Sequence, residues 1–335
     1  MTRTDIRLAL PSKGRLQIST LEFLAHCGFD VKQNSTRGYI GSIPALPNVT
    51  VLLQRPSDII TSVSNGGVDL GITGYDVIAD ANVDDQVNVL HNALGFGRCK
   101  VVIAVPEALP IHTMADLARY AATMPTPLRV ATKYHHLTRN FLAKHGVTPF
   151  VLINAEGSLE VVPEIGYADI IVDIAETGST LQANRLRVIE DGILLTSQSS
   201  LVANRAALLR PAVRAVAIEL LEYFEAHQRA EGYFMVVANV RGASLEDVGR
   251  KVTLQTTLAG LQGPTIAPVY PNPTSAAANG DAHWFAVTLV VSRSVMTNAV
   301  EQLRAIGGSG VVVTPITYIF EEQPTRVAAL RALSQ

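Results

Sequence analysis

The residues with the clearest potential for chemistry lie between positions 168 and 186. An apolar run, Ile170–Ile174, predicts a buried strand, and a segment suited to a helix begins at Leu181. Asp173 lies within this strand, and Glu176 follows it directly before a turn of small residues. Such a turn can direct backbone N–H groups and hydroxyls at one point, and the helix N-terminus adds partial positive charge there. The turn consists of Thr177, Gly178, Ser179 and Thr180.

This arrangement suits a sugar phosphate. The turn would hold a phosphate, and the two acids would accept hydrogen bonds from sugar hydroxyls, so the pattern indicates a ribose 5-phosphate. The alternative is an ordinary turn in which Ser179 or Thr180 caps the helix. Short phosphate-loop patterns often match by chance, so the rest of the chain must decide between the two.

Cationic residues follow two other predicted strands. Lys13 and Arg15 come directly after the first strand, and Gly14 between them allows the backbone to approach a ligand. Arg55 follows a later strand in the same way. Guanidinium and ammonium groups at strand ends suit a pyrophosphate or triphosphate. The alternative is that these are solvated charges in loops between strands and helices.

Three further strand ends carry residues that could line the same site. Gly74 could admit a ligand, and Asp76 after it could cap a helix or contact that ligand. Tyr134 could stack on a base, or it could be an exposed loop aromatic. The third strand end carries Glu156, Gly157 and Ser158.

The elements that must position these residues alternate between strand and helix. This order predicts a largely parallel sheet with ligands at the carboxyl ends of its strands. It occurs twice, which predicts two α/β lobes with a cleft. Gly192–Leu201 is expected to be one strand that returns to the first lobe. The other predicted strands are Ile6–Leu10, Val49–Leu53, Val68–Ile72, Lys100–Val105, Arg129–Thr132 and Phe150–Ile153, and the predicted helices are Gln17–Cys27, Ser57–Asn65, Thr113–Ala122 and Leu137–His145.

A different order of strands and helices follows the amphipathic helix predicted over Pro211–Gly232. Strand, helix, strand, strand, helix, strand suggests a small ferredoxin-like or ACT-like α+β domain, with a last strand over Gly310–Phe320. Tyr270–Asp281 is expected to be a mobile loop. The predicted domains are a first lobe of 1–97 completed by 194–231, a second lobe of 98–193, a C-terminal domain of 232–323 and a solvated tail of 324–335 with some helical tendency.

Composition limits the classes of function. The 335 residues are 48% hydrophobic and 17% charged, which is enough apolar material for several packed domains. A net charge of −2 offers no basic surface for nucleic acid. Two cysteines without paired spacing, and no apolar leader or bilayer-length run, favour a cytoplasmic protein without a membrane partner.

In this order, the segments resemble the ATP phosphoribosyltransferase family, in its long form with a C-terminal regulatory domain. The resemblance extends from residue 6 to about 320. Tyr75 stands where the family often has Lys, and Arg185 replaces a frequent Gly. The matching segments are Leu10–Leu16, Asp69–Gly74, Leu94–Lys100, Arg129–Tyr134, Glu156–Glu160 and Asp173–Leu186, with Leu258–Pro268 and Ala305–Pro315 in the regulatory domain.

The resemblance implies a two-lobed, periplasmic-binding-protein-like core of the type II phosphoribosyltransferase class. It implies that ATP attacks 5-phosphoribosyl 1-pyrophosphate (PRPP) to give N1-(5-phosphoribosyl)-ATP and pyrophosphate, the first step of histidine biosynthesis. Mg²⁺ is expected on the pyrophosphate, without direct protein ligands. L-Histidine is expected as an allosteric inhibitor, with AMP as a second candidate effector, and the assembly as a homo-oligomeric dimer or hexamer.

Residue roles follow from the same resemblance. Asp173, Glu176 and the 177–180 turn are expected to bind PRPP, and Lys13, Arg15 and Arg55 to meet the pyrophosphate or the ATP phosphates. Gly74, Tyr134, Glu156, Gly157 and Ser158 are expected to line the rest of the cleft. The alternatives are a cytoplasmic two-lobed sensor or binding protein, and a catalytically silent regulatory relative.

Overall fold

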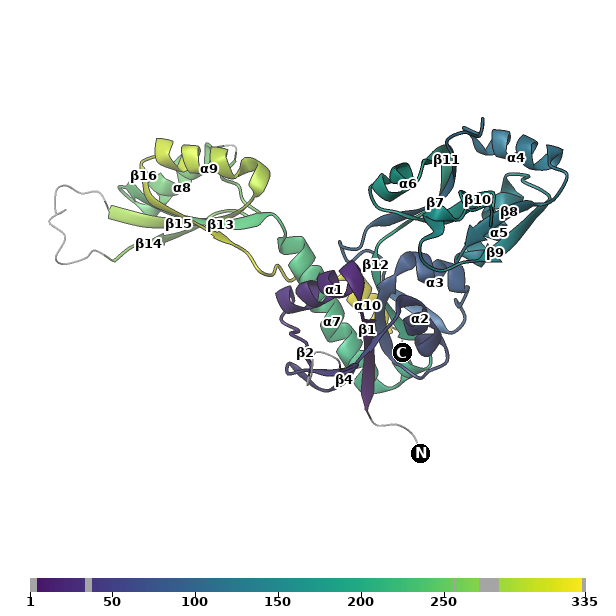
Figure 1. Cartoon of the computed structure of the whole chain (residues 1–335). Helices are drawn as coiled ribbons and strands as arrows, with labels where there is room; N and C mark the ends of the chain where they lie inside the picture. The colour runs from purple at the N-terminus through teal and green to yellow at the C-terminus, as the bar shows by residue number, and fades with distance from the viewer. Residues whose placement is uncertain (1–4, 34–37, 256, 271–282, 333–335) are drawn as a thin grey trace. The chain divides into compact units, whose positions relative to one another are not determined.

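The computed structural model describes residues 5–33, 38–255, 257–270 and 283–332 (Figure 1). The chain divides into two compact units. Unit 1 comprises residues 1–224 and 322–335, and unit 2 comprises residues 225–321. Apart from Tyr270, which is 96% exposed, the loop predicted over Tyr270–Asp281 lies outside the described residues.

Unit 1 contains two sheets, which define lobes I and II. Lobe I has the seven-stranded order β2-β3-β4-β1-β5-β12-β6, in which β1 is parallel to both β4 and β5. Three carboxyl ends therefore meet at one edge of the sheet. The strands of lobe I are β1 (Ile6–Pro11), β2 (Lys32–Gln33), β3 (Ile40–Ile43), β4 (Leu46–Gln54), β5 (Leu70–Gly74), β6 (Val87–His91) and β12 (Ser199–Asn204). Its helices are α1 (Gly14–His26), α2 (Pro56–Ser64), α3 (Tyr75–Ala81), η2 (Ala207–Leu209), α7 (Pro211–Ala230, which continues into unit 2) and α10 (Thr325–Ala332).

Lobe II has the five-stranded order β11-β7-β10-β8-β9, in which β8 is parallel to β10 and β9. The carboxyl ends of these three strands share one edge. The strands of lobe II are β7 (Cys99–Pro106), β8 (Leu128–Thr132), β9 (Phe150–Asn154), β10 (Ile170–Ala175) and β11 (Leu186–Ser197). Its helices are α4 (Met114–Thr123), α5 (His135–Lys144), η1 (Leu159–Val161) and α6 (Ser179–Ala183).

The two lobes repeat one design. Lobe I contains the order β4-β1-β5-β12-β6 and lobe II the order β9-β8-β10-β7-β11, each with an antiparallel fourth strand. In both lobes, an aspartate before the third strand of this order accepts a hydrogen bond from a backbone N–H of the second strand. Asp69 Oδ2 accepts from Arg7 at 2.8 Å, and Asp169 Oδ2 accepts from Arg129 at 2.7 Å.

The predicted return strand Gly192–Leu201 is wrong as one element. Ser197 pairs with Cys99 in lobe II, whereas Ser199 pairs with Gly74 in lobe I, so β11 and β12 belong to different sheets. Gln198 belongs to neither strand, and it is the point at which the chain returns from lobe II to lobe I. Local sequence cannot distinguish these cases, because strand periodicity does not specify which sheet supplies the partner.

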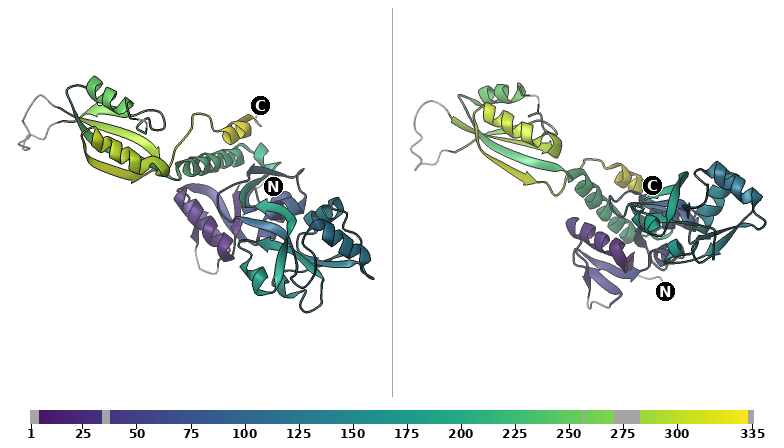
Figure 2. Two further views of the ribbon diagram at one scale, coloured as in Figure 1. Left: turned by 90° about the horizontal axis from the view of Figure 1, so that it is seen from above. Right: turned by 45° about the horizontal axis from the view of Figure 1, so that its top comes forward.

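Unit 2 is a four-stranded antiparallel sheet of order β14-β15-β13-β16. Both of its longer helices lie on one face of this sheet (Figure 2). Val236, Val287 and Leu303 are among the buried residues of its core. The elements are β13 (Tyr233–Gly242), α8 (Leu245–Thr253), β14 (Thr265–Pro268), β15 (His283–Ser292), α9 (Arg293–Ala305) and β16 (Gly308–Pro315).

These elements confirm the predicted fold class, a two-lobed α/β core followed by a ferredoxin-like α+β domain. Two details of the prediction are wrong. The last strand ends at Pro315 rather than Phe320. The predicted solvated tail contains helix α10, whose Val327 and Leu330 are buried in the core of lobe I. Arg331 of this helix also pairs with Glu222 of α7 at 2.7 Å.

Candidate active site

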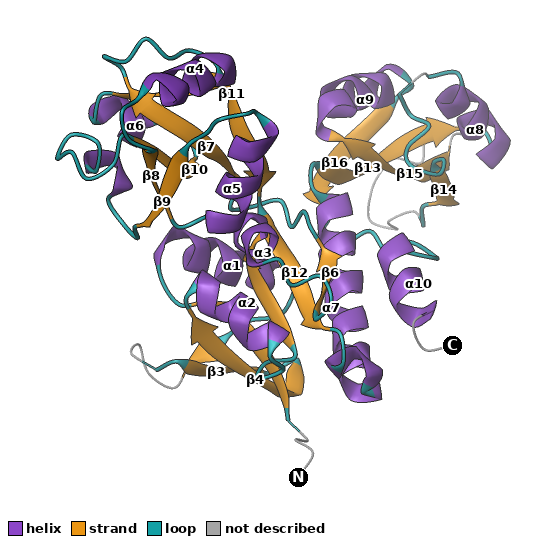
Figure 3. Cartoon of the chain, turned by 90° about the vertical axis from the view of Figure 1, so that its right-hand side faces the viewer, coloured by secondary structure: helices purple, strands orange, loops and turns teal. Residues whose placement is uncertain are grey.

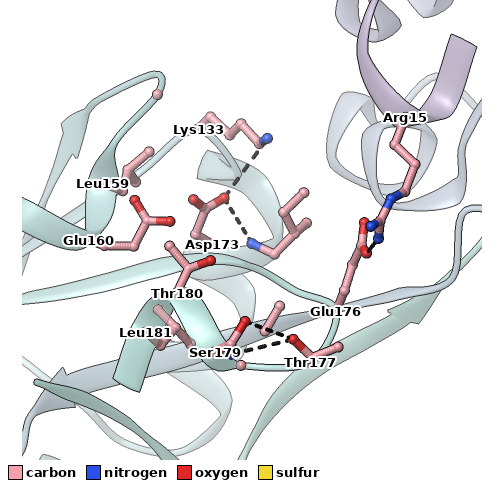
Figure 4. A pocket seen from close by; sticks show the side chains of 14 residues that line it. Arg15, Lys133, Leu159, Glu160, Asp173, Glu176, Thr177, Ser179, Thr180 and Leu181 are labelled. Carbon is pink, nitrogen blue, oxygen red and sulfur yellow. Dashed lines mark hydrogen bonds and ion pairs between the residues drawn. The ribbon is translucent and has the colours of Figure 1, made fainter. Parts of the chain in front are cut away.

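The predicted phosphate turn, residues 177–180, lines a cavity of about 510 Å³ at the carboxyl end of β10, which we call the loop cavity. Thr177 and Ser179 lie together, with their hydroxyl oxygens 3.0 Å apart (Figure 4). Gly178 adopts φ +78°, a left-handed conformation that glycine accepts without strain. Helix α6 is short and contributes little dipole, so the groups of this cavity that can bind an anion are mainly the hydroxyls and backbone amides of the turn. The cavity is lined by Arg15, Lys133, Gly157, Leu159, Glu160, Asp173 and residues 174–181.

Asp173 lies beside a cation in this cavity. Its Oδ1 is 3.9 Å from Lys133 Nζ and accepts a hydrogen bond from the Ile174 N–H at 2.8 Å. Burial raises the pKa of the Asp173 carboxyl, and the Lys133 charge opposes that rise. One hydrogen bond and one ion pair thus position the carboxylate, which lines the cavity.

Arg15 and Glu176 form an ion pair across the cavity (Figure 4). Arg15 belongs to α1 of lobe I, and Glu176 follows β10 of lobe II. Both side chains are exposed, Arg15 to 78% and Glu176 to 44%. An exposed pair of this kind contributes little to stability, so both groups can exchange partners when a charged ligand enters.

A second cavity, of about 430 Å³, is lined by residues of both lobes, and we call it the two-lobe cavity. Lys13 and Arg55 line it from the carboxyl ends of β1 and β4 in lobe I. Lys133 and Gly157 line it from lobe II, and both residues also line the loop cavity. The two cavities are therefore adjacent. Lobe I also contributes Pro56, Ser57, Ile60, Thr61, Val77, Asp80 and Ala81, and lobe II contributes Tyr134 and Glu156.

Tyr134 and Asp76 meet in the interior between the lobes. Tyr134 is 2% exposed, so the alternative of an exposed loop aromatic is wrong. Its hydroxyl donates to Asp76 Oδ2 at 2.6 Å, and the Ser197 hydroxyl donates to Asp76 Oδ1 at 2.8 Å. The alternative that Asp76 caps a helix is wrong, because its carboxylate accepts hydrogen bonds from these two hydroxyls and the N-cap of α3 is Gly74. Gly74 is required here, since a Cβ on it would lie 2.3 Å from Asp76 Oδ1.

Comparison with known proteins identifies this arrangement. A family model described as ATP phosphoribosyltransferase matches residues 55–224, and one described as HisG, C-terminal domain, matches residues 230–318. Two Arabidopsis thaliana proteins, named ATP phosphoribosyltransferase 2 and 1, chloroplastic, are 40% and 41% identical over 98% and 97% of this chain and 80% of each relative. The chain belongs to the ATP phosphoribosyltransferase family.

Other relatives agree with this family membership. The ATP phosphoribosyltransferase of Bradyrhizobium sp. (strain ORS 278) is 35% identical over 97% of both chains. A chain of the structure described as the ATP phosphoribosyl transferase (HisG:HisZ) complex from Thermotoga maritima superposes with a TM-score of 0.51 at 24% identity. It covers 66% of this chain and 98% of that chain, and supports the fold alone.

Three charged residues of the two cavities were missed by the site prediction. Lys133 lines both cavities, Glu160 lines the loop cavity and Asp80 lines the second cavity. A signal for Lys133 existed, because it follows β8 directly and β8 is parallel to β10. Gly74 lines a smaller cavity of about 210 Å³ with Arg15 and Tyr134. Ser158 is exposed and lines none of these three cavities.

The two segments that resemble the family's regulatory domain contain the opposite edge strands of the unit 2 sheet. Leu258–Pro268 ends in β14, and Ala305–Pro315 contains β16, with β15 and β13 between them. Three strand spacings of about 4.8 Å separate the edges. One small ligand therefore cannot contact both edge strands within a single copy of unit 2.

Residues 5–33, 38–255, 257–270 and 283–332 hold no group of three or more His, Cys, Asp or Glu placed to bind a metal ion. Over the same part of the chain, no helix has the length and apolar character needed to cross a bilayer.

Proposed function

We propose that the two adjacent cavities of unit 1 hold the two substrates of phosphoribosyl transfer. As a member of its family, the chain condenses ATP with PRPP in the first step of histidine biosynthesis. The charges and hydroxyls that line each cavity indicate which substrate it takes.

PRPP is assigned to the loop cavity by one observation. The 177–180 turn presents three hydroxyls and a glycine backbone on the same cavity that Asp173 and Glu176 line. Hydroxyls and amides suit the 5-phosphate, and carboxylates suit the ribose 2- and 3-hydroxyls. Arg15 and Lys133 supply positive charge at the side of this cavity from which the pyrophosphate would leave.

ATP is assigned to the two-lobe cavity. Lys13, Arg55 and Lys133 place three cations around about 430 Å³, which suits a triphosphate. Glu156 is the carboxylate of lobe II in this cavity, and it could accept a hydrogen bond from the adenine amino group or a ribose hydroxyl. Because Lys133 and Gly157 line both cavities, the adenine ring and the ribose C1 can meet at their shared boundary.

The chemistry then requires positioning and charge stabilisation. The bond between adenine N1 and ribose C1 forms while the bond from C1 to the pyrophosphate oxygen breaks. Adenine N1 already carries a lone pair, so a strong protein base is not required. Negative charge grows on the leaving pyrophosphate beside Arg15 and Lys133, and positive charge grows on the ribose beside Asp173.

Mg²⁺ is proposed as the ion that enters with the substrate phosphates. Mg²⁺ usually keeps several of its waters and binds through substrate phosphates, so the ion is expected on the pyrophosphate oxygens without direct protein ligands. Bound there, Mg²⁺ would neutralise charge on the pyrophosphate.

The test is pyrophosphate release from ATP and PRPP, combined with PRPP titration of a turn variant. Thr180→Ala should weaken PRPP binding, because it removes a hydroxyl from the 5-phosphate site. Thr126→Ala is the matched control, since Thr126 is an exposed residue of lobe II that lines neither cavity. Unchanged PRPP binding in Thr180→Ala would remove the loop assignment. Binding without pyrophosphate release in the wild type would favour a silent relative or a sensor.

Regulation and assembly belong to the same proposal. We infer that unit 2 binds L-histidine and lowers activity, with AMP as a second inhibitor at the cleft, and that the chain forms a dimer or hexamer in the cytoplasm. The match of unit 2 to a family model described as HisG, C-terminal domain, supports a separate regulatory unit. Histidine titration of pyrophosphate release and sedimentation with and without histidine test these points.

A further inference from the structure

Helix α3 of lobe I presents two aspartates to the start of helix α5 of lobe II. Asp76 and Asp80 are four residues apart, so they share one face of α3. The Tyr134 hydroxyl, at the N-cap position of α5, donates to Asp76 Oδ2 at 2.6 Å. The Leu137 N–H donates to Asp80 Oδ1 at 2.9 Å. Figure 3 shows α3 and α5 side by side between the two sheets.

Asp80 acts as a helix cap supplied by the other lobe. The first N–H groups of a helix have no partner within it, and a carboxylate there also meets the positive end of the helix dipole. Tyr134 does not use its own side chain as the cap. The partner of the Leu137 N–H is thus Asp80 from lobe I.

Asp76 ties the same contact to the crossover between the lobes. Ser197, the last residue of β11, donates its hydroxyl to Asp76 Oδ1 at 2.8 Å and accepts from the Asp76 N–H at 2.9 Å. These groups are buried, where hydrogen bonds are stronger and unpaired groups are costly. One carboxylate therefore joins α3, the crossover and α5.

This contact bears directly on the position of Lys133. Lys133 precedes Tyr134, and its ammonium lies 4.9 Å from the centre of the Tyr134 ring. A rotation of lobe II at this point would carry Lys133 and Glu156 away from Lys13 and Arg55 across the two-lobe cavity. The loop cavity would change less, because all its lining residues except Arg15 belong to lobe II.

We propose that Asp76, Asp80 and Tyr134 are positioning residues that set the angle between lobes I and II, and with it the place of Lys133 in the two-lobe cavity. The inference rests on the proposed function, in which that cavity takes ATP and the loop cavity takes PRPP. It predicts that changes at these three residues weaken the use of ATP and leave PRPP binding nearly unchanged.

The test uses Tyr134→Phe, which keeps the ring, and Asp80→Ala with its conservative partner Asp80→Asn. Asparagine and aspartate cap helices about equally well, so Asp80→Asn should retain the contact. Tyr134→Phe and Asp80→Ala should raise the KM for ATP by roughly 3- to 30-fold, the range expected for loss of a cap. The Kd for PRPP should change by less than about twofold, because the turn is not part of the contact.

Hydrogen exchange gives a readout that is independent of activity. The Leu137 amide should exchange faster in Asp80→Ala than in wild type, and Asp80→Asn should restore both slow exchange and the KM for ATP. Asp85→Ala is the control, because it removes the same charge from an exposed position of lobe I that lines neither cavity.

The outcomes separate this inference from the proposed function. If the wild type binds PRPP through the turn and both variants keep the wild-type KM for ATP, the positioning role is overturned and the function stands. A raised KM in Asp80→Ala alone, without faster Leu137 exchange, would mean direct contact with ATP and would also overturn it. If PRPP does not bind at the turn in the wild type, the proposed function fails first.

Discussion

Gly178→Ala tests the phosphate turn through backbone conformation alone. Gly178 adopts φ +78°, and a Cβ built on it would meet no described heavy atom within 4 Å. The substitution therefore introduces no clash and leaves one cost, the left-handed backbone, which is about 1–2 kcal/mol for a residue with a Cβ. Because the turn is an exposed loop, we expect it to relax away from this conformation rather than strain the whole lobe.

The relaxed turn must return to its original shape to bind PRPP. The conformational cost should then appear in PRPP affinity, as a loss of roughly 5- to 30-fold. The free energy of unfolding should change by less than about 0.5 kcal/mol. Isothermal titration with PRPP and urea unfolding measure the two quantities on the same preparation.

Gly146→Ala is a matched control with the opposite expectation. Gly146 adopts φ +68° with equally open space, but it ends α5, where its N–H donates to the Ala143 carbonyl at 3.1 Å. The strain should therefore appear as about 1 kcal/mol of lost stability, with unchanged PRPP affinity. Equal stability losses in both variants with wild-type PRPP affinity in both would refute this account of the turn.

Three other predictions concern buried charge and thiol chemistry. Asp69→Ala should cost roughly 3 kcal/mol in urea unfolding, because Asp69 is 1% exposed and pairs with Arg210 at 2.9 Å; a cost below about 1 kcal/mol would contradict it. Burial raises the pKa of the Asp173 carboxyl above its ordinary value of 3.8, so the folded state binds this proton more tightly than the unfolded state does. As pH rises through and above that value, the free energy of unfolding of the wild type should therefore fall relative to that of Asp173→Asn. A relative gain with rising pH would contradict this prediction. Burial, with the Asp76 charge, raises the pKa of the Cys99 thiol from 9.0 to about 11, so its thiolate fraction at pH 8 is about a hundredth of that of an ordinary thiol. Alkylation of Cys99 in a Cys27→Ala background should therefore be slow by a similar factor. Alkylation at the rate of an unperturbed thiol would contradict this prediction.

The parts of the site that are local in sequence could be predicted from it. The 177–180 turn follows an apolar strand directly, and Lys13, Arg15 and Arg55 follow their own strands in the same way. Strand ends of a parallel sheet share one edge, so this local pattern already indicates which residues face a ligand. The structure places each of these residues on one of the two cavities.

The contacts between lobes could not be predicted in this way. Tyr134 and Asp76 are 58 residues apart, and their hydrogen bond depends on how two complete lobes dock. Strand and helix periodicity describes which face of an element is apolar, but not which distant element covers it. The same limit explains why Gln198 was not recognised as the crossover between two sheets.

The second strand of the predicted C-terminal order was not located in the sequence, and the helical tail was expected to be solvated, for local reasons. Strand β14 has four residues and ends in proline, so it is too short to show an alternating pattern. Helix α10 carries two buried apolar residues, Val327 and Leu330, among exposed polar ones. That weak spacing resembles a solvated helix, and its burial depends on the groove that lobe I provides.

The capture of the PRPP 5-phosphate by the turn is the central claim, and a crystal structure of the enzyme with PRPP and Mg²⁺ tests it most directly. The account predicts that the phosphate oxygens lie within hydrogen-bond distance of the Thr177, Ser179 and Thr180 hydroxyls, with the ribose hydroxyls toward Asp173 or Glu176. A 5-phosphate bound elsewhere, with residues 177–180 facing solvent, would contradict it.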